Sequence, residues 1–175
     1  HRVDRRQRQM CIRDRVKANE LPMLRAAERA GQQGQMETVV QKGPEYARLY
    51  IQLLGKLSRP DTIQSVLLLV DDLMQAAPEH VEWFVEAEPY AALVHALEVN
   101  DVFVSLKAAQ FLTLCICKQT QQASSYGAPP ADVVEKLVKH IKRTLANATA
   151  TELADDGANG NVAPIFLCMV GELMR

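Results

Sequence analysis

Two adjacent carboxylates, Asp71 and Asp72, are the residues whose types and spacing most suggest catalysis in this chain. All-helical isoprenoid synthases hold magnesium and a diphosphate with an Asp-Asp-x-x-Asp motif, because this hard cation prefers oxygen ligands. Here the fifth position is Gln75, and the sequence has no second acidic motif. On a helix, Asp72 would point away from the apolar side toward solvent. The sequence therefore favours a solvated helix face over a metal site.

The cysteines do not form a metal-binding pattern either. Cys115 and Cys117 are two positions apart, which separates their side chains by about 200° around a helix, so both sulfurs cannot bind one ion. We expect both to be core thiols. With Cys11 and Cys168 they form no paired framework, which indicates reduced thiols in a cytosolic protein.

Histidines and basic residues are the remaining candidates. His95 and His140 lie on different predicted helices, and neither has a Cys or His at ligand spacing, so we expect a surface histidine or a hydrogen-bonded interior one. Four cations line the outer side of one predicted helix. They favour a solvated face that also complements the C-terminal end of the helix dipole. The alternative is a surface for an acidic partner. These cations are Lys136, Lys139, Lys142 and Arg143.

Composition indicates a helical scaffold. The chain has 175 residues, 48% hydrophobic but only 5% aromatic, and Leu, Val, Ala and Met predominate among its apolar residues. It lacks a glycine-rich phosphate loop, a nucleophile elbow and a Ser/His/Asp grouping. No apolar run reaches the roughly 18 residues that span a bilayer, and no apolar stretch of a signal peptide follows the Arg-rich N-terminus. We expect no catalytic, cofactor-binding or metal-binding residue and no direct membrane insertion.

The elements that would position these side chains are helices in pairs. Pro44 follows Gly43 and occupies a first-turn position of the first helix, and Ser58-Arg59-Pro60 ends that helix. Its apolar residues recur at helical spacing and predict one buried stripe. These residues are Tyr46, Leu49, Tyr50, Leu53, Leu54 and Leu57.

Asp61 caps or opens the second helix of this pair. Leu68 and Leu69 widen its apolar stripe so far that we expect the helix to be sandwiched between neighbours. Ala77-Pro78 ends it. A short helix should follow, marked by Val81, Trp83 and Phe84.

The next pair begins at Pro89, with one helix ending at Asn100. Asp101 then caps a long apolar helix that runs to Lys118, and residues 119–130 form a polar loop. The residues expected to face inward on the long helix are Val102, Leu106, Ala109, Leu112 and Ile116.

A third pair is predicted from residues 131–146 and 162–175, separated by a low-complexity insert at 147–161. The final helix, 165–174, is apolar on nearly all sides. We expect it to expose an apolar patch and to drive self-association of the chain. The inward residues of the helix from Asp132 are Val134, Leu137, Val138, Ile141 and Leu145.

These pairs recur at a fixed interval. Pro89 and Pro130 are 41 residues apart, and Asp61 and Asp101 are 40 apart. A helix pair that recurs at roughly 40–47 residues is typical of HEAT and armadillo arrays, in which each pair covers the apolar face of its neighbour. The predicted fold class is therefore all-α, a right-handed α-solenoid of HEAT/armadillo-like repeats, truncated at both ends.

The first fifteen residues stand apart from this pattern. Arg5 to Arg15 resembles, codon by codon, the translated transposase adapter used in sequencing libraries, so we expect residues 1–15 to be non-native and disordered. The alternative is a basic arm for nucleic acid or membrane. The segment holds six of the 20 basic residues and two of the 21 acidic ones. The remaining domain, 16–175, is mildly acidic, which argues against a nucleic-acid partner.

Residues 43–54 and 61–75 resemble the N-terminal domain of the H subunit of the V-type proton-pumping ATPase. The resemblance covers most of 16–145 and is sharpest over 43–84. It includes Thr62-Ile63-Gln64-Ser65, where the family's helix begins with Thr-(Ile/Val)-x-Tyr, and the short aromatic helix after it. The sequence departs from the family at Ser65, where Tyr is usual, and at the insert.

The resemblance implies a non-catalytic regulatory subunit of the pump's cytosolic ATPase sector. Such a subunit supports coupled ATP hydrolysis and proton transport, helps to silence the detached sector, and binds no nucleotide itself. Its implied partners are the peripheral stalk and the large subunit of the membrane sector. Its implied location is cytoplasmic, peripheral to vacuolar or other endomembranes. The alternative function is an unrelated HEAT or armadillo adaptor, and magnesium-diphosphate chemistry is a distant third.

Overall fold

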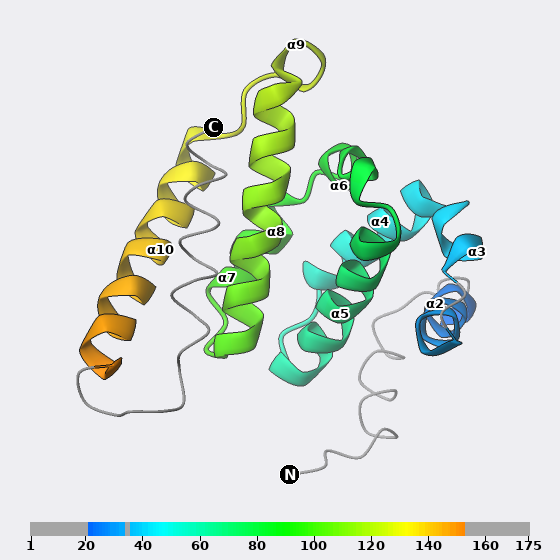
Figure 1. The fold of residues 1–175 in the computed structure, drawn as a ribbon, viewed down its shortest axis with the longest axis horizontal. Coiled ribbons are helices and arrows are strands. Elements are labelled where there is room, and N and C mark those ends of the chain that lie inside the picture. Colours follow the sequence, from blue (N-terminus) through cyan, green and yellow to red (C-terminus); the bar gives the residue numbers. More distant parts are fainter. Residues whose placement is uncertain (1–20, 34–35, 153–175) are drawn as a thin grey trace.

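The computed structural model describes residues 21–33 and 36–152, and every regular element in this part of the chain is helical (Figure 1). The predicted all-α class is confirmed. The elements, in chain order, are α2 (Leu21–Gln33), α3 (Glu37–Val40), α4 (Gly43–Leu54), α5 (Pro60–Ala76), the 3-10 helix η1 (Pro78–His80), α6 (Glu82–Glu86), α7 (Tyr90–Leu97), α8 (Val102–Gln121), α9 (Ala123–Tyr126) and α10 (Ala131–Glu152).

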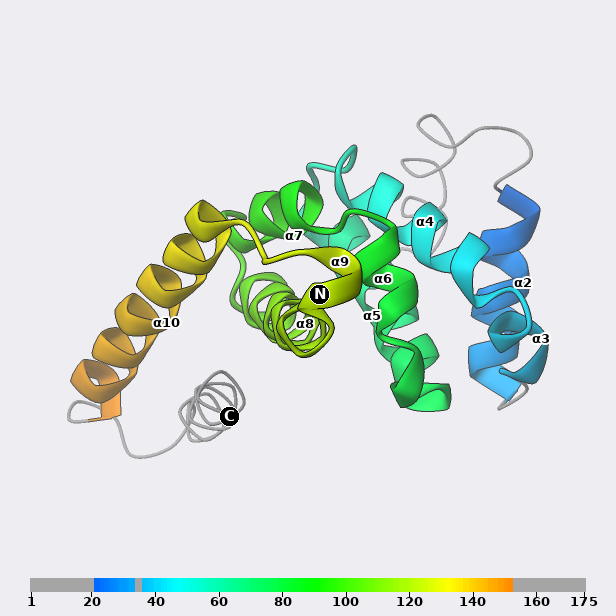
Figure 2. The same cartoon turned by 90° about the horizontal axis from the view of Figure 1, so that it is seen from above.

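Helices α4 to α8 form two stacked pairs. Within each pair, α4 packs on α5 and α7 packs on α8; between the pairs, α4 packs on α7 and α5 on α8. Figure 2 shows α4 and α7 on one side of the molecule and α5 and α8 on the other. Helix α10 continues the array by packing on α7 and α8. This is the layered arrangement of a helical solenoid, and its right-handedness stays a prediction.

The first pair forms largely as the sequence predicts. Pro44 lies in the first turn of α4, where its missing N–H removes no helical hydrogen bond. Helix α5 begins one residue earlier than expected, at Pro60, so Asp61 lies in the first turn and pairs with Arg59 at 3.0 Å. The predicted stripe of the first helix is confirmed, because all six of its members are buried: Tyr46, Leu49, Tyr50, Leu53, Leu54 and Leu57.

Helix α5 lies between neighbours as predicted, with α2, α3 and α4 in contact with it as well as α8. Of the two leucines expected to widen its buried stripe, Leu69 is buried and Leu68 is not. Leu68 is 48% exposed, whereas its neighbour Leu67 is fully buried. The helix is therefore packed between neighbours but leaves the turn around Leu68 open to solvent.

Helix α8 is capped as predicted, and Ala109, Leu112 and Ile116 of the predicted stripe are buried, but the buried face extends to one side of that stripe. The carboxylate of Asp101 accepts a hydrogen bond from the Val104 backbone N–H at 2.9 Å, as an N-cap should. Val102 is 71% exposed rather than buried, because the cap places it on the outer side of the first turn. Leu106 is only half-buried. The buried face comprises Val104, Ala108, Ala109, Phe111, Leu112, Thr113, Cys115, Ile116 and Gln119.

Two helix ends lie beyond their predicted positions. Helix α8 continues to Gln121, and the short helix α9 occupies part of the predicted loop at 119–130. Helix α10 continues to Glu152, into the predicted insert at 147–161. Residues 146–152 contain no Gly or Pro and include three alanines, the best helix former, so nothing in this stretch ends the helix.

Helix α10 buries a face shifted from the predicted one. Val133, Leu137, His140 and Ile141 are buried, whereas Val138 is exposed. Val134 and Leu145 are half-buried at the edge of the contact. The predictions for residues 1–15 and for the apolar helix 165–174 lie outside the described residues.

Helix α8 is the only helix in the described ranges that is long and apolar enough, by length and composition, to cross a membrane. Half of its apolar window is buried inside the fold. It also contacts α5, α6, α7, α9 and α10. These contacts are those of a central core helix.

Candidate interaction surfaces

The adjacent carboxylates Asp71 and Asp72 do not converge on a shared site. Asp71 accepts a hydrogen bond from Lys107 Nζ on α8 at 2.9 Å, and this pair is about four-fifths buried. Asp72 is half-buried, not turned to solvent as expected. Burial, and then the charge of Asp71, raise the pKa of Asp72, and its own charge acts on Tyr50 of α4. The two carboxylates thus serve different helix contacts, which is a poor geometry for holding a metal-diphosphate.

The two helical cysteines lie in different surroundings, as their spacing predicts. Cys115 is buried, and burial raises the pKa of its thiol to about 12, so the thiol stays protonated. Cys117 is half-buried, so the expectation of a core thiol is confirmed for Cys115 alone. In the described residues, no group of three or more His, Cys, Asp and Glu side chains is placed to hold a metal ion.

Both histidines contact other residues of the fold, and neither is placed as a metal ligand among the described residues. His95 is exposed on α7, and its Nε2 lies 3.0 Å from the Leu57 carbonyl, to which an N–H there can donate. His140 is buried on α10, within reach of Thr144 and Arg143. Burial, followed by the charge of Arg143, lowers the pKa of His140, so this histidine is kept neutral.

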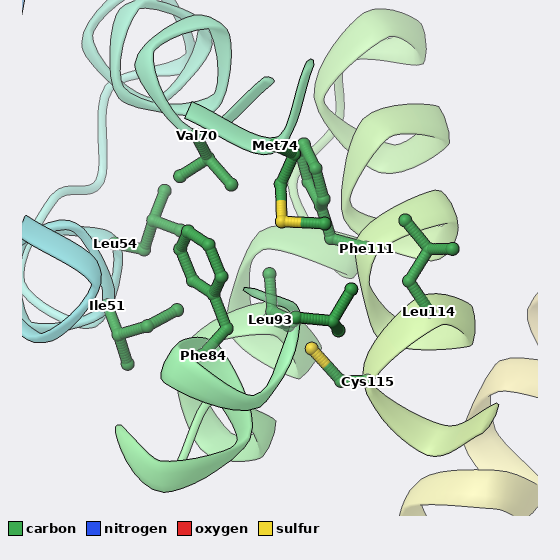
Figure 3. Close-up of a pocket in the computed structure, with 10 residues that line it drawn as sticks. Ile51, Leu54, Val70, Met74, Phe84, Leu93, Phe111, Leu114 and Cys115 are labelled. Atoms are coloured by element: carbon green, nitrogen blue, oxygen red, sulfur yellow. The ribbon is translucent and has the colours of Figure 1, made fainter. Parts of the chain in front are cut away.

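A narrow hollow lies where the two helix pairs meet (Figure 3). Phe84 of α6 points into it from one side and Phe111 and Cys115 of α8 from the other, and carbon and sulfur atoms line it. With no polar group to orient a ligand, it is a packing defect of the seam rather than a binding site. Its other lining residues are Ile51, Leu54, Val70, Met74, Val81, Leu93 and Leu114.

Polar contacts bind α5 to α8 across the same seam. Gln64 Nε2 donates to both carboxylate oxygens of Asp101 at 3.1 Å, and Lys107 pairs with Asp71 farther along the two helices. In the sequence of α5, the exposed Leu68 lies between Gln64 and Asp71, the two residues that make these polar contacts. Asp101 therefore starts α8 and also joins it to the preceding pair. Sequence reasoning assigned Asp101 only the capping role.

The short helix α6 is held by a cluster that the sequence analysis missed. The imidazole of His80 stacks on the Trp83 indole, with ring centroids 4.2 Å apart. Glu82 lies 3.2 Å from His80 Nδ1 and 3.0 Å from Lys118 Nζ. Burial tends to raise the pKa of Glu82, but hydrogen bonds from its own backbone N–H, Lys118 and His80, with the charge of Lys118, hold it below its usual value. Contacts between α6 and α8 thus include a charged pair.

The basic residues of α10 are exposed, as predicted, but their expected electrostatic reason is wrong. Lys136, Lys139, Lys142 and Arg143 all face outward. The helix runs on to Glu152, and its last turn contains no basic residue. The dipole acts mainly within the last turn, so it does not account for cations placed in the middle of α10.

The helix pairs are stacked and present exposed polar, charged and apolar faces. This is a helical-repeat scaffold, a class of protein that binds other proteins. The family model for the H subunit of the V-ATPase matches residues 9–167. The chain therefore belongs to the V-ATPase H subunit family, and the family's N-terminal domain is the part that the chain resembles. The match begins within residues 1–15, and the non-native origin of that segment stays a prediction.

The chain is also similar to the probable H subunit of the V-type proton ATPase from Oryza sativa subsp. japonica. The two are 28% identical over 79 residues, which make up 42% of this chain and 18% of that relative. The chain thus aligns with less than a fifth of the relative's length. No solved structure matches the chain. Family membership removes the unrelated HEAT or armadillo adaptor as the alternative function and indicates a role like that of the family.

Proposed function

We propose that this chain is part of a non-catalytic regulatory subunit of a V-type proton pump and acts through protein contacts made by its helical array. The observation that carries the proposal is the family match over residues 9–167. In the described residues, the groups weighed for metal or catalytic chemistry do not gather at one site: Asp71 pairs with Lys107, Cys115 is buried on α8 and His140 is buried on α10. The chemistry of ATP hydrolysis would therefore belong to other subunits.

The proposed partners are the peripheral stalk and the large subunit of the membrane sector. The protein would support coupled ATP hydrolysis and proton transport in the assembled pump, and would help to silence the detached ATPase sector. It would work on the cytoplasmic side of vacuolar or other endomembranes. A repeat scaffold suits this role, because its surface is long relative to its core and can meet two partners at once.

Binding to the pump's ATPase sector tests the proposal. The purified chain would be mixed with a detached ATPase sector prepared without its H subunit, and complex formation would be followed by sedimentation velocity and size-exclusion chromatography. We expect comigration with the sector. ATP hydrolysis in the same mixture would show whether this part of the protein is enough to silence the sector.

An intact H subunit from the sector's own source is the positive control, and an unrelated helical-repeat protein of similar charge is the negative control. If the intact protein comigrates and this chain does not, the proposed function is wrong for this chain.

We also propose that the domain proper is 16–175 and that residues 1–15 make no contribution to it. An Arg-rich segment without apolar periodicity cannot bury enough surface to offset the entropy lost on ordering. A chain beginning at Val16 should therefore unfold at the same temperature as the whole chain in differential scanning calorimetry. A clear drop in that temperature would contradict the proposal.

A further inference from the structure

The four exposed cations of α10 are close neighbours on the surface of the helix. Lys136 and Lys139 are three residues apart, as are Lys139 and Lys142, and Lys139 and Arg143 are four apart. Residues at these spacings are neighbours on a helix surface, and like charges there repel one another. Asp132 and Glu135 lie four residues before Lys136 and Lys139, a spacing that offsets part of this repulsion. Lys142 and Arg143 have no acidic residue three or four positions away on either side.

The fold itself offers these cations little compensation. Within residues 21–33 and 36–152, Lys136, Lys139 and Lys142 have no carboxylate within ion-pair distance, although other cations of the described residues do. Arg143 contacts the neutral ring of His140, which offers it no opposite charge. The cations also lie well before the end of α10, so the helix dipole does not stabilise them.

The same face is acidic at its other end. Asp132 and Glu135 are exposed in the first turns of α10 and lie on the same side as the four cations by helical spacing. A uniformly anionic surface, such as a lipid bilayer or a nucleic acid, would be repelled by these carboxylates. The apolar face of α10 is also buried in the fold by Val133, Leu137 and Ile141, so little apolar surface is left for membrane insertion.

We propose that this face of α10 is a docking surface for an acidic helical segment of a partner protein. Lys136, Lys139 and Arg143 follow one helical stripe about 10 Å long. Glutamates or aspartates at positions i, i+3 or i+4, and i+7 of a partner helix have the same spacing and would each meet a cation. The inference rests on the proposed function for the identity of the complex in which the partner occurs.

Charge reversal tests the surface. The test variant carries Lys136→Glu, Lys139→Glu and Lys142→Glu, and it leaves Arg143 in place because of its contact with the buried His140. The matched control carries Arg25→Glu, Arg29→Glu and Arg48→Glu, which replace three cations of α2 and α4 outside the α10 face and change the net charge equally. Circular dichroism and urea denaturation would verify that both variants fold.

The first readout is binding to the detached ATPase sector. We expect the test variant to bind at least about ten-fold more weakly than the unmodified chain, with the control close to the unmodified chain, and we expect added salt to narrow the difference. If the test variant binds the sector as well as the control does, this inference is wrong and the proposed function stands. If the unmodified chain itself fails to bind, the proposed function is wrong.

The second readout does not need the pump. A fluorescent, alanine-based helical peptide with glutamates at positions i, i+3 and i+7 serves as the acidic probe, and anisotropy measures its binding. Vesicles of phosphatidylserine and phosphatidylcholine serve as the lipid probe. We expect the unmodified chain to bind the peptide, the test variant not to bind it, and neither to bind the vesicles. Stronger binding to vesicles than to peptide, or equal peptide binding by both chains, would overturn the inference.

Discussion

The indole of Trp83 occupies the space in which a β-carbon on Gly43 would lie. A β-carbon built at position 43 would come within 1.9–2.4 Å of three carbon atoms of the ring. Only glycine therefore lets α6 lie against the start of α4, where Trp83 also stacks on His80. Gly43 precedes Pro44, so its sequence context indicates a helix start and hides this second role.

Replacing Gly43 with alanine should therefore push Trp83 and α6 out of place. We expect Gly43→Ala to cost about 1–3 kcal/mol of unfolding free energy, the usual range for overpacking. Urea denaturation followed by the fluorescence of Trp83, the single tryptophan of the chain, measures both the loss and the change in its environment.

Gly55→Ala is the matched control. A β-carbon at Gly55 would have its nearest neighbour at 3.7 Å, and the residue has ordinary helical backbone angles. Alanine also favours the helix by up to about 1 kcal/mol over glycine. A Gly43→Ala chain as stable as the Gly55→Ala chain, with unchanged fluorescence, would show that α6 does not depend on this contact.

Leu67 and Leu68 provide a test of the observed orientation of α5. Leu67 is fully buried and Leu68 is 48% exposed, although the two are adjacent and identical in type. Leu67→Ala should cost about 3 kcal/mol, the usual loss for a buried leucine, whereas Leu68→Ala should cost less than about 1 kcal/mol. Equal losses in urea denaturation would mean that Leu68 is covered in solution and that its side of α5 is also buried, as the sequence suggested.

Asp101 and Asp61 stand at equivalent places of the repeat but make different contacts. Asp101 caps α8 and accepts both bonds from Gln64, whereas Asp61 lies inside the first turn of α5 and pairs with Arg59. Asp101→Ala should cost about 1–2 kcal/mol through loss of the cap and the inter-helix bond. Asp61→Ala should cost well under about 1 kcal/mol, because its ion pair is exposed. Chemical denaturation of both variants compares them directly, and the reverse order would contradict the assignment of the cap.

His140 should make stability fall in mild acid. Burial and the Arg143 charge lower its pKa below 6.5, so the unfolded chain binds a proton at a higher pH than the folded chain does. The stability that the neutral ring contributes is present above pH 6.5 and is lost as the pH falls from there toward the lower folded pKa.

The urea concentration at the unfolding midpoint should therefore decrease as the pH is lowered from about 7.5 to about 5.5. The decrease should be smaller in a His140→Gln variant. His95→Gln is the control, because it removes an exposed histidine and leaves the buried His140 in place. If His140→Gln shows the same fall as the unmodified chain, another group is responsible for the acid sensitivity.

The helix pairs could be predicted from the sequence because their signals are local. Pro44, Pro60 and Asp101 fix where helices begin through their own backbone and capping chemistry, and the 40-residue interval relates one pair to the next. The orientation of α8 could not be predicted in the same way. That helix is apolar on most sides, so periodicity alone does not choose between Val102 and Val104 as the buried residue.

The contacts at the candidate surfaces were less predictable. Asp71 and Lys107 are 36 residues apart, and their pairing depends on the stacking of α5 on α8, which no local pattern encodes. The contact of Trp83 with Gly43 likewise joins two segments through the fold. The exposure of the α10 cations was predicted, but their relation to the helix dipole depended on how far the helix continues, and it reaches at least Glu152.

Each helix pair packs mainly on the next pair along the chain, and this should make folding fast. Helix α10 rests on α7 and α8, and these in turn rest on α4 and α5, so most stabilising contacts join segments close in sequence. Low contact order lowers the entropic barrier to folding, and structure can nucleate at one pair and spread to its neighbours. The α7–α8 hairpin, closed by the short turn between Leu97 and Val102, is the natural nucleus, and the amide protons of its buried helix α8 would be the last to exchange with solvent.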